Sequence, residues 1–210
     1  MAHIIVFGDS TTYGAWDSQG GWVQRMREKL DVKNIQGKHY FLIYNQGISG
    51  DTSKGMLKRF EHELIPRLDD AGENIVIISG GGNDALYSRK TKKHWVEIPA
   101  FKRNYARMIT IARKYTQQII VTGVEPCDET KTDPVPWEPT VSYLEKHIER
   151  YNDALKSVCE KENVQFLNFF GKLNNKKFIA TLKDGIHPND KGQQMMEKIV
   201  WEAMRKRRWV

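Results

Sequence analysis

The stretch His3-Ile4-Ile5-Val6-Phe7 runs without interruption into Gly8-Asp9-Ser10, and this junction decides how the rest of the chain is interpreted. Its apolar residues do not alternate with polar ones, which is typical of a strand covered on both faces, as in a parallel sheet. Functional loops leave the carboxyl ends of such strands. The junction therefore predicts a buried first strand that delivers Ser10 to one edge of a sheet.

Four further apolar runs predict strands at residues 40–44, 74–79, 118–122 and 164–169. Segments with helical periodicity are predicted at 21–31, 51–68, 101–115, 140–162 and 189–207. This alternation predicts a doubly wound α/β sandwich. If the strand order is 2-1-3-4-5, the loops after the second and third strands flank the first, and Gly47 and Asn83 come up on either side of Ser10.

Length and composition set outer limits on the function. A chain of 210 residues, 40% of them hydrophobic, is expected to form one domain over residues 1–210. The longest apolar runs have four or five residues, far below the ~20 needed to cross a bilayer. The N-terminus lacks a signal-peptide pattern, so we expect a cytoplasmic protein without a membrane span. Two cysteines, Cys127 and Cys159, predict free thiols, and we expect neither a metal nor a cofactor.

The net charge of +7 is concentrated in residues 86–118, where nine lysines and arginines stand against Glu97 alone. Such a patch can attract nucleic acid or anionic substrates. However, the apolar residues of 101–115 recur at helical spacing, which places Arg103, Arg107 and Lys114 on the solvent side of a helix. We expect no nucleic-acid partner. Selection of anionic substrates and the oligomeric state stay open.

Ser10 suits the part of a nucleophile if a base and an orienting acid lie nearby, since a serine hydroxyl is unreactive at neutral pH. Asp184 and His187 provide that pair. Because His187 follows Asp184 by three positions on a turn, the carboxylate can accept from one imidazole nitrogen while the other nitrogen faces Ser10. The residues therefore predict a catalytic triad in the order Ser, Asp, His.

Acyl transfer also requires donors for the developing oxyanion. The candidates are the backbone N–H groups of Ser10 and Gly47 and the side-chain amide of Asn83. Each has a structural alternative, because Ser10 can cap a helix, Gly47 can serve a left-handed turn and Asn83 can cap the next helix. Their joint order along the chain favours catalysis.

Together these motifs resemble the SGNH hydrolase superfamily, also called the GDSL esterase/lipase family. The likeness rests on Phe7-Gly8-Asp9-Ser10, Asn45-x-Gly47-x-Ser49-Gly50, Gly81-x-Asn83-Asp84 and Asp184-x-x-His187-Pro188, which cover nearly the whole chain. The resemblance implies a flavodoxin-like, three-layer α/β/α sandwich with a parallel five-stranded sheet. It also implies catalytic Ser10, Asp184 and His187, and an oxyanion hole from Ser10, Gly47 and Asn83. Thr11 departs from the leucine or isoleucine usual after the serine, which affects packing more than chemistry.

Two readings compete with a serine esterase. Gly80-x-Gly82-x-x-Ala85 formally fits a dinucleotide-binding fingerprint, but it follows the third strand and lacks the expected acidic residue about 20 positions on. A nucleotide- or carbohydrate-binding domain without hydrolase activity is the second reading. For a hydrolase the partner is a small-molecule substrate that carries an acyl group. The residues leave open whether this substrate is a carboxylic ester, a thioester or an acetylated sugar.

The segment 123–140 is the predicted substrate-binding loop. Its prolines exclude a long helix, and it leaves the fourth strand on the same rim as Ser10. Trp137 in this loop is a candidate wall of the acyl site, with burial under a surface loop as the alternative. Since no lid-sized amphipathic insertion occurs elsewhere, we expect soluble substrates with short acyl chains.

Overall fold

The computed structural model describes residues 1–37 and 39–210. Its central sheet has five parallel strands in the order β2-β1-β3-β6-β8, which is the predicted order 2-1-3-4-5 once the short strands of a second sheet are set aside. The five are β1 (Ala2–Gly8), β2 (Phe41–Gly47), β3 (Glu73–Ile78), β6 (Gln118–Thr122) and β8 (Gln165–Leu167). The predicted α/β class and flavodoxin-like topology are therefore confirmed.

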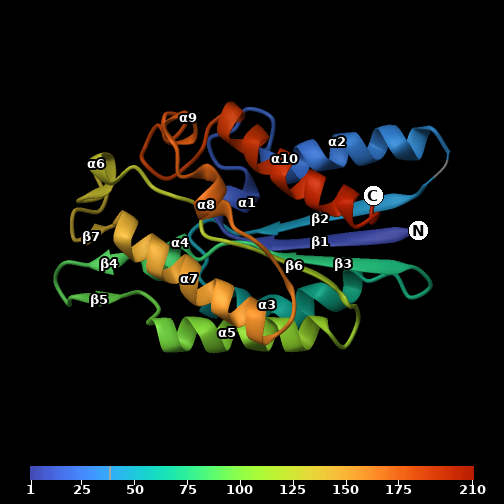
Figure 1. Ribbon diagram of the computed structural model, residues 1–210, viewed down its shortest axis with the longest axis horizontal. Coiled ribbons are helices and arrows are strands. Elements are labelled where there is room, and N and C mark those ends of the chain that lie inside the picture. Colours follow the sequence, from blue (N-terminus) through green and yellow to red (C-terminus); the bar gives the residue numbers. More distant parts are fainter. Residues whose placement is uncertain (38) are drawn as a thin grey trace.

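Helices cover both faces of this sheet, which makes three layers (Figure 1). One face carries α2 (Gly21–Ile35) and α10 (Asp190–Lys206), and the other carries α3 (Ser53–Leu64), α5 (Ile98–Ala112) and α7 (Glu145–Lys161). The remaining helices are short: α1 (Ser10–Tyr13), η1 (Ile65–Arg67), α4 (Gly82–Ala85), α6 (Glu129–Thr132), α8 (Phe169–Leu173) and α9 (Lys176–Ile179).

The uninterrupted apolar runs have a direct structural reason. Along β1, Ile5 and Phe7 belong to the core cluster that includes α3, α5 and α7, whereas Ile4 and Val6 belong to the cluster that includes α2 and α10. Successive side chains of a strand point to opposite faces, and both faces are covered here. A strand buried on both sides must therefore be apolar at every position.

The loops at the carboxyl ends of the strands gather at one end of the molecule (Figure 1). A second, antiparallel sheet stands there, formed by β4 (Tyr87–Ser88), β5 (Lys93–His94) and β7 (Val141–Ser142) in the order β5-β4-β7. The sequence analysis did not predict it. Strands of two residues are too short to show a hydrophobic pattern in the sequence. Their positions depend on the loops that they connect.

Helix and strand ends differ from the predicted bounds by a few residues. The predicted strand 40–44 extends to Gly47, and the predicted strand 164–169 stops at Leu167 because Phe169 already begins α8. The helix predicted over 101–115 begins at Ile98, since Pro99 suits a first helical turn. Its predicted stripe is confirmed, with Phe101 and Tyr105 fully buried and the basic side chains outside. Among the described residues, no helix has the length and apolar character required to span a membrane.

Candidate active site

Ser10 lies where β1 turns into α1, at the carboxyl edge of the sheet. It is the first residue of that helix, and the helix cap is Asp9, whose Oδ1 accepts from the Thr11 N–H at 3.1 Å. The Ser10 side chain is thus free of a capping role. At 8% exposure, Ser10 is nearly buried but reaches the surface of a cavity.

His187 and Asp184 lie together on the turn before α10 and face Ser10. His187 Nε2 is 2.8 Å from Ser10 Oγ, and His187 Nδ1 is 2.6 Å from Asp184 Oδ2. The three residues predicted to act together are thus joined in one hydrogen-bonded line, although 177 positions separate His187 from Ser10. Asn189, which directly follows His187-Pro188, caps α10 through the N–H groups of Lys191 and Gly192.

The Asp184 carboxylate is held in its ionised form. Partial burial opposes ionisation, but hydrogen bonds from the His187 ring and from the backbone N–H groups of His187 and Ile186 outweigh it. The pKa of Asp184 therefore lies well below its usual range. A carboxylate that stays charged can fix the tautomer of His187 and stabilise its cationic form.

A fourth donor to Asp184 comes from a residue that no sequence pattern indicated. Trp16 Nε1 donates to Asp184 Oδ2 at 2.6 Å, and the indole packs edge-on against the His187 ring. Nothing in the spacing of Trp16 separates it from an ordinary exposed tryptophan, so only the folded chain could identify it.

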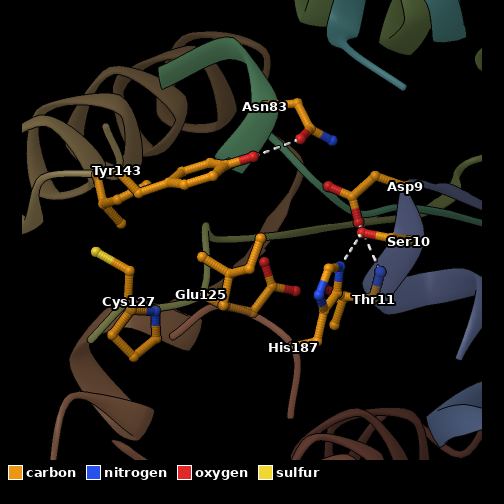
Figure 2. Close-up of a pocket in the computed structure, with 12 residues that line it drawn as sticks. Asp9, Ser10, Thr11, Asn83, Glu125, Cys127, Tyr143 and His187 are labelled. Atoms are coloured by element: carbon orange, nitrogen blue, oxygen red, sulfur yellow. Dashed lines mark hydrogen bonds between the residues drawn. The ribbon is translucent and has the colours of Figure 1, made fainter. Parts of the chain in front are cut away.

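Asn83, in the first turn of α4, has an amide whose orientation is determined by its partners. Its Nδ2 donates to the Asp51 carbonyl at 2.8 Å, and its Oδ1 accepts from the Tyr143 hydroxyl at 2.9 Å (Figure 2). A carbonyl can only accept, which identifies the nitrogen. The second Nδ2 hydrogen is left for another acceptor, and Asn83 lines two cavities together with Ser10.

The structure does not favour Gly47 as the predicted oxyanion donor, because its N–H is already engaged. Gly47 is the last residue of β2, paired with Gly8, and its N–H donates to Asn45 Oδ1 at 2.9 Å. A Cβ at this position would overlap the backbone of Tyr13 and approach Thr12 C to 2.8 Å. Gly47 is therefore a glycine because α1 packs directly against the end of β2.

Gly50 occupies the place expected of Gly47. It lines a cavity with Ser10 and Asn83, has a φ of +78° and lies beside Asp51, whose carbonyl Asn83 holds. Within residues 1–37 and 39–210, the N–H groups of Gly50 and Ser10 have no protein acceptor. The motif Asn45-x-Gly47-x-Ser49-Gly50 contains both glycines. Their different roles depend on the end of β2, which lies three residues further along than predicted.

Two cavities adjoin Ser10 and His187. One is small, about 30 Å³, and its lining includes Pro126, Cys127 and Ile148. The other, about 190 Å³, is walled by aromatic and aliphatic groups that include Trp95, Val135 and Trp137. Trp137 is 56% exposed, so the alternative of an aromatic buried under a loop does not hold.

Three buried carboxyls lie around the small cavity and behind it. Burial raises the pKa of Asp84 to about 7 and that of Glu125 to about 8, and it also raises the pKa of Asp9. Glu125 lies between Cys127 and His187 in Figure 2, and its Oε1 is buried without a hydrogen-bond partner among the described residues. Asp84 instead accepts from the N–H and hydroxyl of Ser53.

Two further predictions concern the two cysteines and the glycine-rich stretch after β3. Cys127 and Cys159 are free and buried, and burial raises the pKa of each thiol to about 12. The Gly80-x-Gly82-x-x-Ala85 stretch leads into the four-residue helix α4 rather than into a long helix that could hold a pyrophosphate. In the described part of the chain, no group of three His, Cys, Asp or Glu residues is arranged to hold a metal ion.

Comparisons with known proteins identify a matching family and similar folds. Residues 6–195 match the model of the GDSL-like lipase/acylhydrolase family. The human isoamyl acetate-hydrolyzing esterase 1 homolog is 21% identical over 97% of this chain and 82% of its own. A crystal structure of the lipase/acylhydrolase from Enterococcus faecalis superposes with a TM-score of 0.78 at 20% identity, covering 99% of this chain and 97% of its own. A member of the lipolytic G-D-S-L family from Veillonella parvula gives a TM-score of 0.72 at 20% identity, with 96% and 97% covered.

Proposed function

The chain belongs to the GDSL-like lipase/acylhydrolase family and is an ester hydrolase, and from this premise we propose that Ser10, His187 and Asp184 carry the reaction. The observation that supports the assignment is the line of hydrogen bonds from Ser10 Oγ through both nitrogens of His187 to Asp184. This is the geometry that nucleophilic catalysis by a serine requires.

In the proposed mechanism, Ser10 Oγ attacks the carbonyl carbon of the ester while His187 Nε2 takes the hydroxyl proton. The tetrahedral intermediate collapses as the bond to the alcohol oxygen breaks, and His187 returns the proton to that oxygen. Water then attacks the acyl-enzyme, His187 again accepts a proton, and the carboxylic acid leaves as Ser10 is restored. Asp184 stays ionised and stabilises the imidazolium that forms in both halves.

The oxyanion that forms in each half needs donors already directed at it. We assign this task to the Ser10 N–H, the second Nδ2 hydrogen of Asn83 and the Gly50 N–H. Asn83 holds the carbonyl of Asp51, so the loop that carries Gly50 and the turn that carries Asn83 are tied together. This bond keeps two donors from different loops in register with the nucleophile.

The cavities favour esters with short acyl chains. At roughly 30 Å³ for each water-sized group, the 190 Å³ cavity has room for about six such groups. A palmitoyl chain has sixteen carbons, far more than this space holds. A relative whose name refers to an acetate ester agrees in direction with this preference. The substrate proposed is therefore a soluble, short-chain carboxylic ester.

The decisive experiment is covalent labelling combined with kinetics. A fluorophosphonate should label Ser10, and Ser10→Ala should abolish the labelling. Ser10→Ala and His187→Ala should each lower kcat by several powers of ten, down to the residual rate given by binding and oxyanion stabilisation. Ser157 and His62 lie on helices α7 and α3, away from the cavities, so Ser157→Ala and His62→Ala are matched controls. A folded Ser10 or His187 variant that keeps more than a tenth of kcat would refute the assignment.

A further inference from the structure

Trp16 makes two contacts with the residues proposed to act on Ser10. Its Nε1–H donates to Asp184 Oδ2 at 2.6 Å, on the same oxygen that binds His187 Nδ1. Its ring meets the His187 imidazole edge-on, with centroids 5.5 Å apart and planes at 85°. Yet Trp16 is 67% exposed. A large apolar ring in this position gains little from burial, so its contacts must be explained in another way.

The backbone at Trp16 is strained. Its φ is +63°, in the left-handed region that residues other than glycine rarely adopt. Such strain persists only where the surrounding structure enforces it, and it is concentrated at functional sites. The conformation of Trp16 is therefore imposed on it by its neighbours.

Asp17, the next residue, supplies the first anchor. Its carboxylate is fully buried and forms an ion pair with Arg25 of α2, and it also accepts from the N–H groups of Gln19 and Gly21. Four donors on one buried carboxylate leave the backbone around Asp17 little freedom. The residue before it is held accordingly.

Ser18 supplies the second anchor, on the other side of the site. Its N–H and hydroxyl donate to the two carboxylate oxygens of Asp190 at 3.1 and 2.6 Å. Asp190 is the first residue of α10, directly after the turn that carries Asp184 and His187. The loop of Trp16 is thus bonded both to α2 and to the start of α10, which directly follows the turn that carries His187.

We propose that Trp16 is a positioning residue that holds Asp184 and His187 in their working geometry. This inference rests on the proposed function. With Trp16 in place, Asp184 has two backbone donors on Oδ1 and two ring donors on Oδ2. The carboxylate cannot rotate without losing several bonds together, and the indole edge limits the tilt of the imidazole.

The indole N–H also acts on the charge of Asp184. A donor on Oδ2 withdraws part of the negative charge that stabilises the His187 imidazolium, so removing the donor makes protonated His187 more stable. The other titratable groups near His187 are unaltered by a change at Trp16. They are Asp9, Glu125, Cys127 and Tyr143 around the small cavity, Glu138 at the large one, and Tyr13 and Asp17 beside Trp16.

The test is Trp16→Phe, which keeps an aromatic ring but removes the N–H. We expect kcat to fall about tenfold while KM stays within about twofold, because a hydrogen bond to a charged group is lost away from the substrate. The acid limb of the kcat/KM profile should move to higher pH. Trp201→Phe is the control, since Trp201 lies on α10 against Lys29 and Lys33.

Unchanged kcat and an unmoved acid limb in a folded Trp16→Phe variant would overturn the proposal. A rise in KM alone would do the same, since it would make Trp16 a substrate contact. Hydrogen exchange of the indole N–H in the unaltered protein is an independent test that needs no catalysis and no variant. Trp16 should exchange more slowly than Trp137, although their exposed fractions are 67% and 56%. Equal rates would overturn the proposal even if Ser10 proves to be the nucleophile.

Discussion

Asn83 illustrates, at the scale of single residues, how a proposed catalytic group is held by its neighbours. One amide hydrogen is committed to Asp51 and the oxygen to Tyr143, so the second hydrogen points in one defined direction. This arrangement incurs little reorganisation when the oxyanion forms, which is the condition for effective electrostatic stabilisation.

Asn83→Ala should therefore lower kcat by about 10²–10³ with a much smaller effect on KM, because the lost bond forms with the oxyanion. Steady-state kinetics on a short-chain ester measures both constants. Tyr143→Phe is the companion variant: it keeps the Asn83 amide but removes one of its holders, and kcat should fall by about tenfold or less. If Asn83→Ala raised KM alone, Asn83 would be a group that binds the substrate in its ground state.

The limits of prediction from sequence are clear at this scale. Asp184 and His187 could be assigned because a carboxylate and an imidazole three residues apart can bond on a turn whatever surrounds them. Gly47 was chosen in place of Gly50 because both are glycines in one loop, and their tasks depend on where β2 ends. Trp16 could not be foreseen, since it belongs to none of the quoted motifs and its bond to Asp184 exists only in the folded chain.

At the scale of elements, the contact between α1 and the end of β2 determines where Ser10 lies. Gly47→Ala should destabilise the protein by about 1–3 kcal/mol, the usual range for overpacking, because its Cβ would collide with backbone atoms of α1 that cannot rotate away. Gly82→Ala is the matched control, since a Cβ there meets nothing within 4 Å. Chemical denaturation of both variants measures the difference, and equal stabilities would contradict this reading of Gly47.

The loop between β6 and β7 bears on substrate choice. It carries Trp137 to the wall of the 190 Å³ cavity, with only the short helix α6 along its course. We expect kcat/KM to peak at acetyl or butyryl esters and to fall at octanoyl and palmitoyl esters. Trp137→Ala should shift this optimum to longer chains, since each further buried methylene contributes ~0.8 kcal/mol. A profile still rising to palmitoyl, or an optimum that Trp137→Ala does not move, would contradict the corresponding half of this prediction.

The order of the elements was more predictable than their ends. Continuous apolar runs such as Ile75-Val76-Ile77-Ile78 occur because both faces of the sheet are covered, and that pattern is visible in the sequence. The last turn of a helix or the last pair of a strand depends on contacts with other elements. β2 runs on to Gly47 because Gly8 pairs with it, and no local property of residues 45–47 indicates that partner.

At the scale of the whole molecule, the two core clusters meet at the sheet, and the active-site edge is where polar groups enter the interior. Asp9, Asp84 and Glu125 are all buried there, and none forms an ion pair with a lysine, arginine or histidine in the part of the chain that the structure describes. Three carboxylates without cations cannot all be ionised at low cost. The folded chain therefore keeps protons that the unfolded chain releases.

Because of those protons, the free energy of unfolding should depend on pH, and Glu125 provides the clearest test. Burial, with Asp9 nearby, raises its pKa to about 8, whereas the unfolded chain releases this proton near its ordinary value of 4.5. Between these values the unfolded state binds fewer protons than the folded state, so the free energy of unfolding falls as pH rises. Glu125→Gln removes this loss, and its Tm relative to the unaltered protein should increase by about 3 °C or more between pH 5 and pH 8.

Glu138→Gln, at an exposed carboxyl, should show no such trend. The contribution of Asp84 is present in both proteins and largely cancels in the comparison. A Tm difference that stays constant from pH 5 to pH 8 would mean that Glu125 is already ionised in the folded protein.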